Sequence, residues 1–160
     1  MIAKAIMIDP VARTVSGIEV PLTLLDDEPE AGPQVNFKDL YPLLGCDSIE
    51  TWYLPNGRDA GLIDAEGLYR NKHFFQLGPD SRPVPGKCII IGHNIETDSW
   101  QDVTVSVEEV SQIIQWTRRV LRDVRNSTWE GPYGEPIIEM EVILPIVDEG
   151  RVETEPRTPT

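Results

Sequence analysis

The chain has 160 residues, of which 40% are hydrophobic, and its 27 acidic residues against 14 lysines and arginines give a formal net charge of −13. This length fits one domain, and the apolar content excludes a wholly disordered chain. The negative charge disfavours direct binding to nucleic acid or to an anionic membrane. There is no signal-like segment and no apolar run of about 18 residues, so we expect a cytoplasmic protein with reduced thiols at Cys46 and Cys88.

The first third of the chain predicts a hairpin, a loop and a short helix. Residues 3–9 and the β-branched run at 14–22 flank the turn dipeptide Asp9-Pro10, which predicts two antiparallel strands. The acids, prolines and glycine of residues 25–35 predict a mobile loop. An N-cap at Asp39, with Pro42 in the first turn and Gly45 after the last helical residue, predicts a short helix.

The middle of the chain predicts the sheet. Residues 48–54 alternate in polarity and are followed by Asn56-Gly57, a dipeptide typical of tight hairpin turns, before a returning strand at 62–64. HFFQL at 73–77 predicts a further strand. Three consecutive isoleucines in CIIIG at 88–92 predict a central strand buried on both faces.

The last third predicts one long helix and one strand. Ser106 and Glu109 form a capping-box pattern, and apolar residues at three- and four-residue steps predict a helix to about Asn126 that covers the sheet. IIEMEVILP at 137–145 predicts a strand. We therefore expect a single α+β domain at 1–147, with a mostly antiparallel mixed sheet, one long and one short helix, and a disordered acidic tail at 148–160.

A cluster of arginines is the most unusual feature of the predicted long helix. Arg118, Arg119, Arg122 and Arg125 fall in its last two turns, one turn after Trp116. They can complement the helix dipole and pair with acids, or they can form an anion pocket in which guanidinium groups bind phosphate and an aromatic ring stacks on a base. The predicted ligand-binding set comprises Trp116, Arg118, Arg119, Arg122, Arg125, Trp129 and Arg58, with Tyr133 as a further aromatic candidate.

Signals for catalysis are few. The chain has two histidines and lacks a nucleophile elbow, a phosphate-binding loop and a His-Glu-x-x-His motif. His93, Glu96 and Asp98 follow a strand end and offer an alternative, a metal-assisted hydrolase, although a polar loop has the same composition. Asp64 and Glu66 are more typical of a turn than of an acid–base pair. We predict no catalytic residue, no metal and no cofactor.

Several segments together resemble a known family. AIMIDP, LYPLLGCDSIETWYLPNGRDAGLIDAEGL, HFFQLG and PVPGKCIIIG are similar to the uncharacterised domain-of-unknown-function family 3846, over roughly residues 1–120. That family is carried by bacteriophages, plasmids and other mobile elements. The resemblance implies a small accessory protein made inside a bacterial host, and it implies no catalytic residues.

These observations favour a non-enzymatic accessory binding protein involved in counter-defence. One hypothesis is a sponge for a nucleotide-type signal, which uses the arginines and closes its pocket as a homo-oligomer. The other is an acidic protein-protein inhibitor or DNA mimic that binds a host protein. Accordingly, the expected partner is a small anionic ligand or a host protein, and not a membrane.

Overall fold

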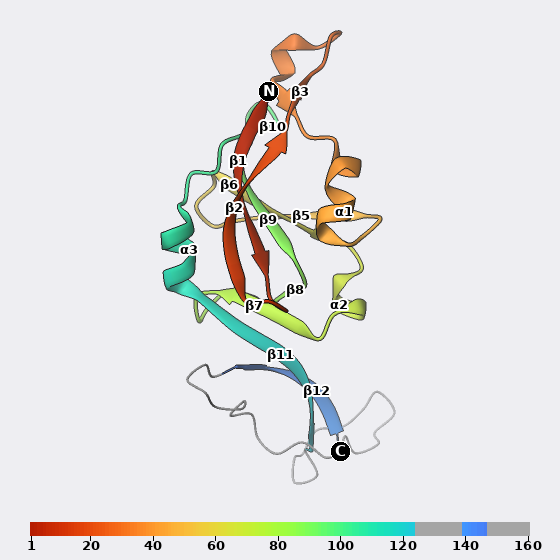
Figure 1. Ribbon diagram of the computed structural model, residues 1–160, viewed down its shortest axis with the longest axis vertical. Coiled ribbons are helices and arrows are strands. Elements are labelled where there is room, and N and C mark those ends of the chain that lie inside the picture. Colours follow the sequence, from red (N-terminus) through yellow and green to blue (C-terminus); the bar gives the residue numbers. More distant parts are fainter. Residues whose placement is uncertain (124–138, 147–160) are drawn as a thin grey trace.

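The computed structural model describes residues 1–123 and 139–146, and within them every strand pairing is antiparallel (Figure 1). The strands are β1 (Ile2–Asp9), β2 (Thr14–Pro21), β3 (Thr23–Leu24), β4 (Pro33–Gln34), β5 (Ile49–Tyr53), β6 (Asp59–Asp64), β7 (His73–Leu77), β8 (Val84–Pro85), β9 (Cys88–Asn94), β10 (Ser99–Gln101), β11 (Ile114–Asp123) and β12 (Glu139–Pro145). The helices are α1 (Tyr41–Leu44), α2 (Gly67–Arg70) and α3 (Val107–Ile113), and there are 3-10 turns at Pro29–Ala31 and Phe37–Leu40. The expected α+β class with mostly antiparallel strands is confirmed.

The main sheet has the order β2-β1-β9-β6-β5, and β10 adds to it by pairing with β9. β9 is therefore central, as its three isoleucines predict. One edge of β9 is shared, because β1 pairs with residues 88–90 and β10 pairs with residues 92–94. β6 pairs along the other edge. The two hairpins β1–β2 and β5–β6 lie where the sequence places them.

Both faces of this sheet are covered. On one face Ile89 and Ile91 pack with Leu40 and Leu44, which belong to the segment that includes α1. On the other face Ile90 packs with Phe75 of β7 and Val110 of α3. Alternate residues of one strand thus enter two cores, which is the arrangement that a continuous apolar strand favours.

The prediction of one long helix from Ser106 to about Asn126 is wrong. Ser106 does cap a helix, and its hydroxyl accepts a hydrogen bond from the Glu109 N–H at 3.0 Å. However, α3 ends at Ile113, and Ile114 takes the extended conformation that begins β11. β-branched and aromatic residues from Ile114 to Thr117 favour a strand, and β7 provides a pairing partner for them. The spacing of the apolar residues in this segment fits the period of a helix as well as that of a strand, and the pairing with β7 decides between the two.

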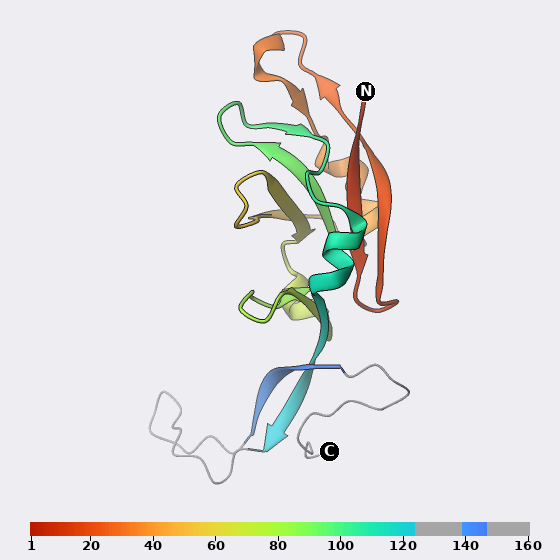
Figure 2. The same ribbon diagram turned by 90° about the vertical axis from the view of Figure 1, so that its left-hand side faces the viewer.

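β11 belongs to a second sheet rather than covering the first. The strand order of this second sheet is β12-β11-β7-β8. The strand expected at 137–145 therefore pairs with the segment that was expected to be helical. In Figures 1 and 2 this sheet lies at the end of the molecule opposite β3. The predicted tail at 148–160 lies outside the described residues.

The smaller predictions are confirmed in part. α1 contains Pro42 near its start, and Gly45 ends it in the left-handed conformation at φ 67°, although Asp39 lies in the preceding 3-10 turn instead of capping the helix. Residues 25–35 contain a 3-10 turn, and β3 pairs with β4 across them. Gly32 fits closely against Ser99, because an added Cβ would lie 2.9 Å from the Ser99 Cβ. The segment is thus a folded excursion in place of the expected loop.

Candidate functional site

Two hairpin turns form a polar pocket. The first turn, residues 54–58, joins β5 to β6, and the second, residues 95–98, joins β9 to β10. Since β6 and β9 are neighbours in the sheet, both turns lie at the same end and project in the same direction in Figure 2. Between them is a cavity of about 570 Å³, here called the turn pocket. Its lining residues are Gly57, Arg58, His93, Asn94, Ile95, Glu96 and Gln101.

Side-chain hydrogen bonds fix the first turn. Only the glycine of Asn56-Gly57 has a positive φ, at 70°, and the Asn56 Oδ1 accepts hydrogen bonds from the N–H groups of Arg58 and Asp59 at 2.9 and 3.0 Å. The Asp59 carboxylate is buried and accepts hydrogen bonds from the Asn56 side chain at 2.6 Å and from the Thr104 N–H at 2.9 Å. Arg58 thus follows a turn that is tied to the chain beyond β10.

The second turn is fixed in the same way. The Asn94 Oδ1 accepts hydrogen bonds from the N–H groups of Glu96 and Thr97, at 3.0 and 3.4 Å. Asp98 takes a positive φ of 50°, a conformation that aspartate tolerates better than most residues. These contacts fix the backbone at Glu96, which lines the pocket from the second turn as Arg58 does from the first.

Arg58 and Glu96 line the same pocket without pairing. Both side chains are exposed, and within the described part of the chain neither makes a hydrogen bond or an ion pair. The basic residues that do form such pairs there include Arg70 and Arg82, which bind Glu66 and Glu50. A guanidinium and a carboxylate that face one cavity and remain unpaired are both available to a ligand.

His93 lies beneath this pocket and is only 4% exposed. Its Nε2 lies 2.9 Å from the Asp98 carboxylate, while its Nδ1 is buried and has no hydrogen-bond partner among the described residues. The ring lies between Trp100 and Tyr53, at centroid distances of 4.6 and 5.3 Å. The ring lines the cavity, but one of its nitrogens is hydrogen-bonded to Asp98 and the other is buried, so the imidazole supports the second turn.

The predicted ligand-binding residues that the structure describes are divided between β11 and the turn pocket. Trp116 and Arg118 lie on β11, where Trp116 packs into the second core and the Arg118 Nε is buried. The Arg119 guanidinium lies over the Phe74 ring and donates a hydrogen bond to the Leu68 carbonyl. Arg58 lies in the turn pocket instead.

The rest of the predicted set cannot be placed in a pocket. The backbone of Arg122 pairs with Met140, and Arg125, Trp129 and Tyr133 lie outside the described residues. Arg118, Arg119 and Arg122 lie on a strand instead of the expected helix, and a strand places successive side chains such as those of Arg118 and Arg119 on opposite faces. Whether the arginines of this segment bind a ligand stays a prediction.

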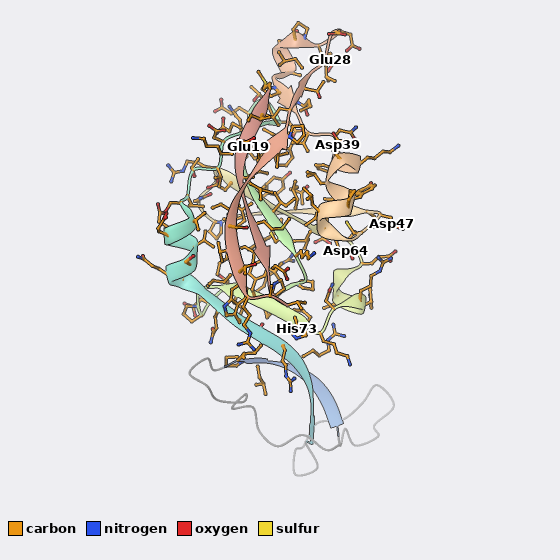
Figure 3. The ribbon with its side chains drawn as sticks, in the orientation of Figure 1. Glu19, Glu28, Asp39, Asp47, Asp64 and His73 are labelled. Atoms are coloured by element: carbon orange, nitrogen blue, oxygen red, sulfur yellow. The ribbon has the colours of Figure 1, made fainter. Side chains whose placement is uncertain are left out.

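The pair Asp64 and Glu66 is held by an arginine. Arg70 Nη2 lies 2.7 Å from Glu66 Oε2, and Arg70 Nη1 lies 3.7 Å from Asp64 Oδ2. Arg70 is also 3.9 Å from Asp47, and Figure 3 shows Asp47 and Asp64 beside α1 and α2. The hydrogen bond that Arg70 donates to the Glu66 carboxylate, together with the negative charge of Asp64, raises the pKa of Arg70. As predicted from the sequence, Asp64 also accepts a backbone hydrogen bond in its own turn, from the Glu66 N–H at 2.9 Å.

The two cysteines are protonated thiols of unequal access. Burial raises the pKa of Cys88 to about 12, and burial together with the Asp64 charge raises the pKa of Cys46. Cys46 is partly exposed, whereas Cys88 is fully buried. Neither has the lowered pKa of a reactive thiolate.

We expect a maleimide reagent near pH 8 to label Cys46 slowly and to leave Cys88 unlabelled in the native protein. The pKa of Cys88 is higher in the folded than in the unfolded protein, so the protonated thiol stabilises the fold. This stabilisation is complete below the ordinary thiol pKa of 9.0 and is lost as the pH rises toward about 12. Labelling of Cys88 should therefore require denaturant or strongly alkaline pH. Mass spectrometry of the labelled peptides reports both sites, with Cys46→Ala as the control, and rapid labelling of Cys88 in the native protein would contradict the structure.

Two further features are absent from residues 1–123 and 139–146. In these ranges no group of three or more histidine, cysteine, aspartate or glutamate side chains is arranged to hold a metal ion. His93, Glu96 and Asp98 are close in sequence, but they do not form one group. His93 and Asp98 are hydrogen-bonded to each other, and Glu96 lines the pocket separately. None of the helices in the same ranges is long and apolar enough to cross a membrane.

Comparisons with known proteins found no matching family model, no matching curated protein and no matching solved structure. The resemblance to the domain-of-unknown-function family stays a prediction.

Sequence reasoning selected Arg58 as a ligand-binding residue and Glu96 only as a metal ligand. It missed Asn94 and Gln101 as pocket residues. The turn-forming asparagines Asn56 and Asn94 are a usable signal for the two turns. That the turns meet depends on the pairing of β6 with β9, which no local pattern specifies.

Proposed function

We propose that the turn pocket binds a small anionic ligand of the nucleotide type, and that the protein acts by holding this ligand without converting it. The observation that carries the proposal is the Arg58 guanidinium, which lines the cavity and has no partner within the described residues. A guanidinium forks onto phosphate oxygens, and such charge-assisted hydrogen bonds are about twice as strong as neutral ones. The cavity of about 570 Å³ lies in the size range of small-molecule sites.

Two neighbouring features support a binding role. Tyr53 is 55% exposed and its ring lies beside His93, so it offers a flat surface on which a base can stack. His93 itself has one nitrogen on Asp98 and the other buried, so it is not positioned for proton transfer to a ligand. These contacts favour a preformed binding site over a catalytic one.

In the cell this activity fits an accessory protein of a phage or mobile element that sequesters a nucleotide-type signal in the bacterial cytoplasm. The net charge of −13 repels anions at long range. Screening by salt limits that field to about 8 Å at physiological ionic strength, so a local guanidinium decides binding at contact. A homo-oligomer would offer a second wall for the open side of the pocket.

Isothermal titration with the common ribonucleoside 5′-monophosphates tests this proposal. We expect binding by the native protein and a loss of about 10- to 100-fold in affinity for Arg58→Gln, since a hydrogen bond to a charged group contributes about 1.5–3 kcal/mol. Lys38→Gln removes one exposed cation elsewhere and should bind as the native protein does.

Arg118→Gln distinguishes the turn pocket from the arginine segment on β11. Binding that survives Arg58→Gln and disappears in Arg118→Gln, with thermal unfolding unchanged, would move the site to β11. An absence of binding for every monophosphate would contradict the proposal.

A second candidate is binding of a host protein by the acidic excursion. Asp26, Asp27, Glu28 and Glu30 are exposed on a segment that is held in place, since the Gln34 side chain donates a hydrogen bond to the Asp98 carbonyl at 3.1 Å. Figure 3 shows Glu28 at the tip of this excursion. Affinity for such a partner would weaken steeply with salt, and salt-insensitive binding would count against this role.

A further inference from the structure

The turn pocket contains an unpaired acid as well as an unpaired base, and this limits the ligands that fit it. Arg58 and Glu96 line the cavity from different turns, and within the described residues no ion pair joins them. A ligand that carries only negative charge would satisfy Arg58 but would be repelled by Glu96. The cavity therefore favours a ligand with an anionic group at one end and hydrogen-bond donors at the other.

Among nucleotides, the base decides which ligand meets this requirement. A carboxylate is an acceptor with two oxygens. Guanine presents two adjacent donors, its N1–H and its exocyclic amino group, to which a carboxylate can bind with both oxygens. Adenine presents a donor beside an acceptor, whose lone pair is repelled by a carboxylate. Uracil and cytosine also lack the pair of adjacent donors.

We infer that the turn pocket binds a guanine nucleotide, with Glu96 accepting hydrogen bonds from the base and Arg58 binding the phosphate. This inference rests on the proposed function, since it requires that the ligand be a nucleotide. Gln101 and Asn94 line the same cavity with amide groups. The Asn94 Oδ1 is used by the turn, so its NH₂ group is the part that remains for an acceptor on the ligand.

The position of Glu96 is set by the turn, which makes selectivity for one base feasible. Its N–H is bonded to Asn94, and Asp98, two residues later, is bonded to His93. A carboxylate on a fixed turn has less freedom to adapt to adenine than one on a free loop. Discrimination by one good bidentate contact is about 1–3 kcal/mol, which corresponds to roughly 5- to 150-fold in affinity.

The test compares guanosine and adenosine 5′-monophosphates by isothermal titration at one ionic strength. We expect the native protein to bind the guanine nucleotide at least about tenfold more tightly. Glu96→Gln replaces one acceptor oxygen by a donor, which matches the edge of adenine, so the preference should disappear or reverse. Glu30→Gln makes the same change of charge on the acidic excursion and should keep the native preference.

The outcomes separate this inference from the function on which it rests. Equal affinities for the two nucleotides that both fall in Arg58→Gln would overturn the guanine assignment and leave the nucleotide site in place. A guanine preference that persists in Glu96→Gln would also overturn it. If neither nucleotide binds, the guanine assignment fails, and if the uridine and cytidine monophosphates do not bind either, the proposed function fails with it.

Discussion

Gly92→Ala is expected to lower the free energy of unfolding by about 3 kcal/mol, because overpacking typically costs about 1–3 kcal/mol and a contact with rigid backbone belongs at the upper end of that range. A Cβ built at Gly92 would lie 2.1 Å from the carbonyl oxygen of Asp102, and 2.8 Å from its carbonyl carbon. Backbone cannot rotate away from such a contact as the end of a flexible side chain can. Residue 102 is also held from the other side, since the Lys4 N–H donates to the Asp102 carboxylate at 2.8 Å and the Val103 N–H donates to the Lys4 carbonyl at 2.9 Å.

Gly17→Ala is the matched control for this substitution. Gly17 also lies in a strand of the main sheet, but the nearest atom to its added Cβ is the Val107 Cγ2 at 4.0 Å. We expect a change within about 1 kcal/mol, in either direction. Chemical denaturation of both variants measures the difference. Equal stability of the two variants would show that the backbone of Asp102 does not lie against Gly92.

Asp59→Ala is expected to destabilise the protein by about 3 kcal/mol or more, since each buried polar group left without a partner costs about 1–3 kcal/mol. The Asp59 side chain is 2% exposed and accepts hydrogen bonds from Asn56 and from both the N–H and the hydroxyl of Thr104. Its removal leaves several donors unsatisfied and releases the turn that carries Arg58. Ligand binding by the turn pocket should therefore fall together with stability.

Asp9→Ala provides the comparison for Asp59. The Asp9 carboxylate also accepts two backbone hydrogen bonds in a hairpin turn, from Val11 and Ala12, but these bonds are exposed to solvent. The expected cost is about 0.5–1.5 kcal/mol. Asp59→Asn keeps the shape of the side chain and should fall between the two alanine variants. Urea denaturation measures the free energy of unfolding of all three variants. A loss of stability in Asp59→Ala no greater than that in Asp9→Ala would contradict the role assigned to the buried carboxylate.

Features specified by local chemistry were predictable from the sequence. The triple isoleucine of β9, the cap at Ser106 and the left-handed glycine at Gly45 each depend on neighbouring residues, and the structure contains all three. The segment after Ile113 was mispredicted because its apolar spacing fits a helix and a strand equally. Pairing with β7, about 40 residues earlier in the chain, selects the strand.

The candidate site was only partly predictable for the same reason. Arg58 follows a recognisable turn dipeptide, and Glu96 lies in a recognisable polar loop. Their shared cavity depends on the antiparallel register of β6 and β9, in which Asp59 is opposite Gly92. This register is a long-range property of the fold, so the sequence suggested both residues but placed them in different hypotheses.

The most direct test of the ligand site is a ¹⁵N–¹H correlation spectrum recorded during titration with guanosine 5′-monophosphate. The turn pocket predicts that the largest shifts occur at Gly57, Arg58 and residues 93–101, and that Arg58→Gln needs at least about tenfold more nucleotide to reach them. Shifts confined to β11, or an unchanged titration midpoint in Arg58→Gln, would contradict the assignment of this pocket as the binding site.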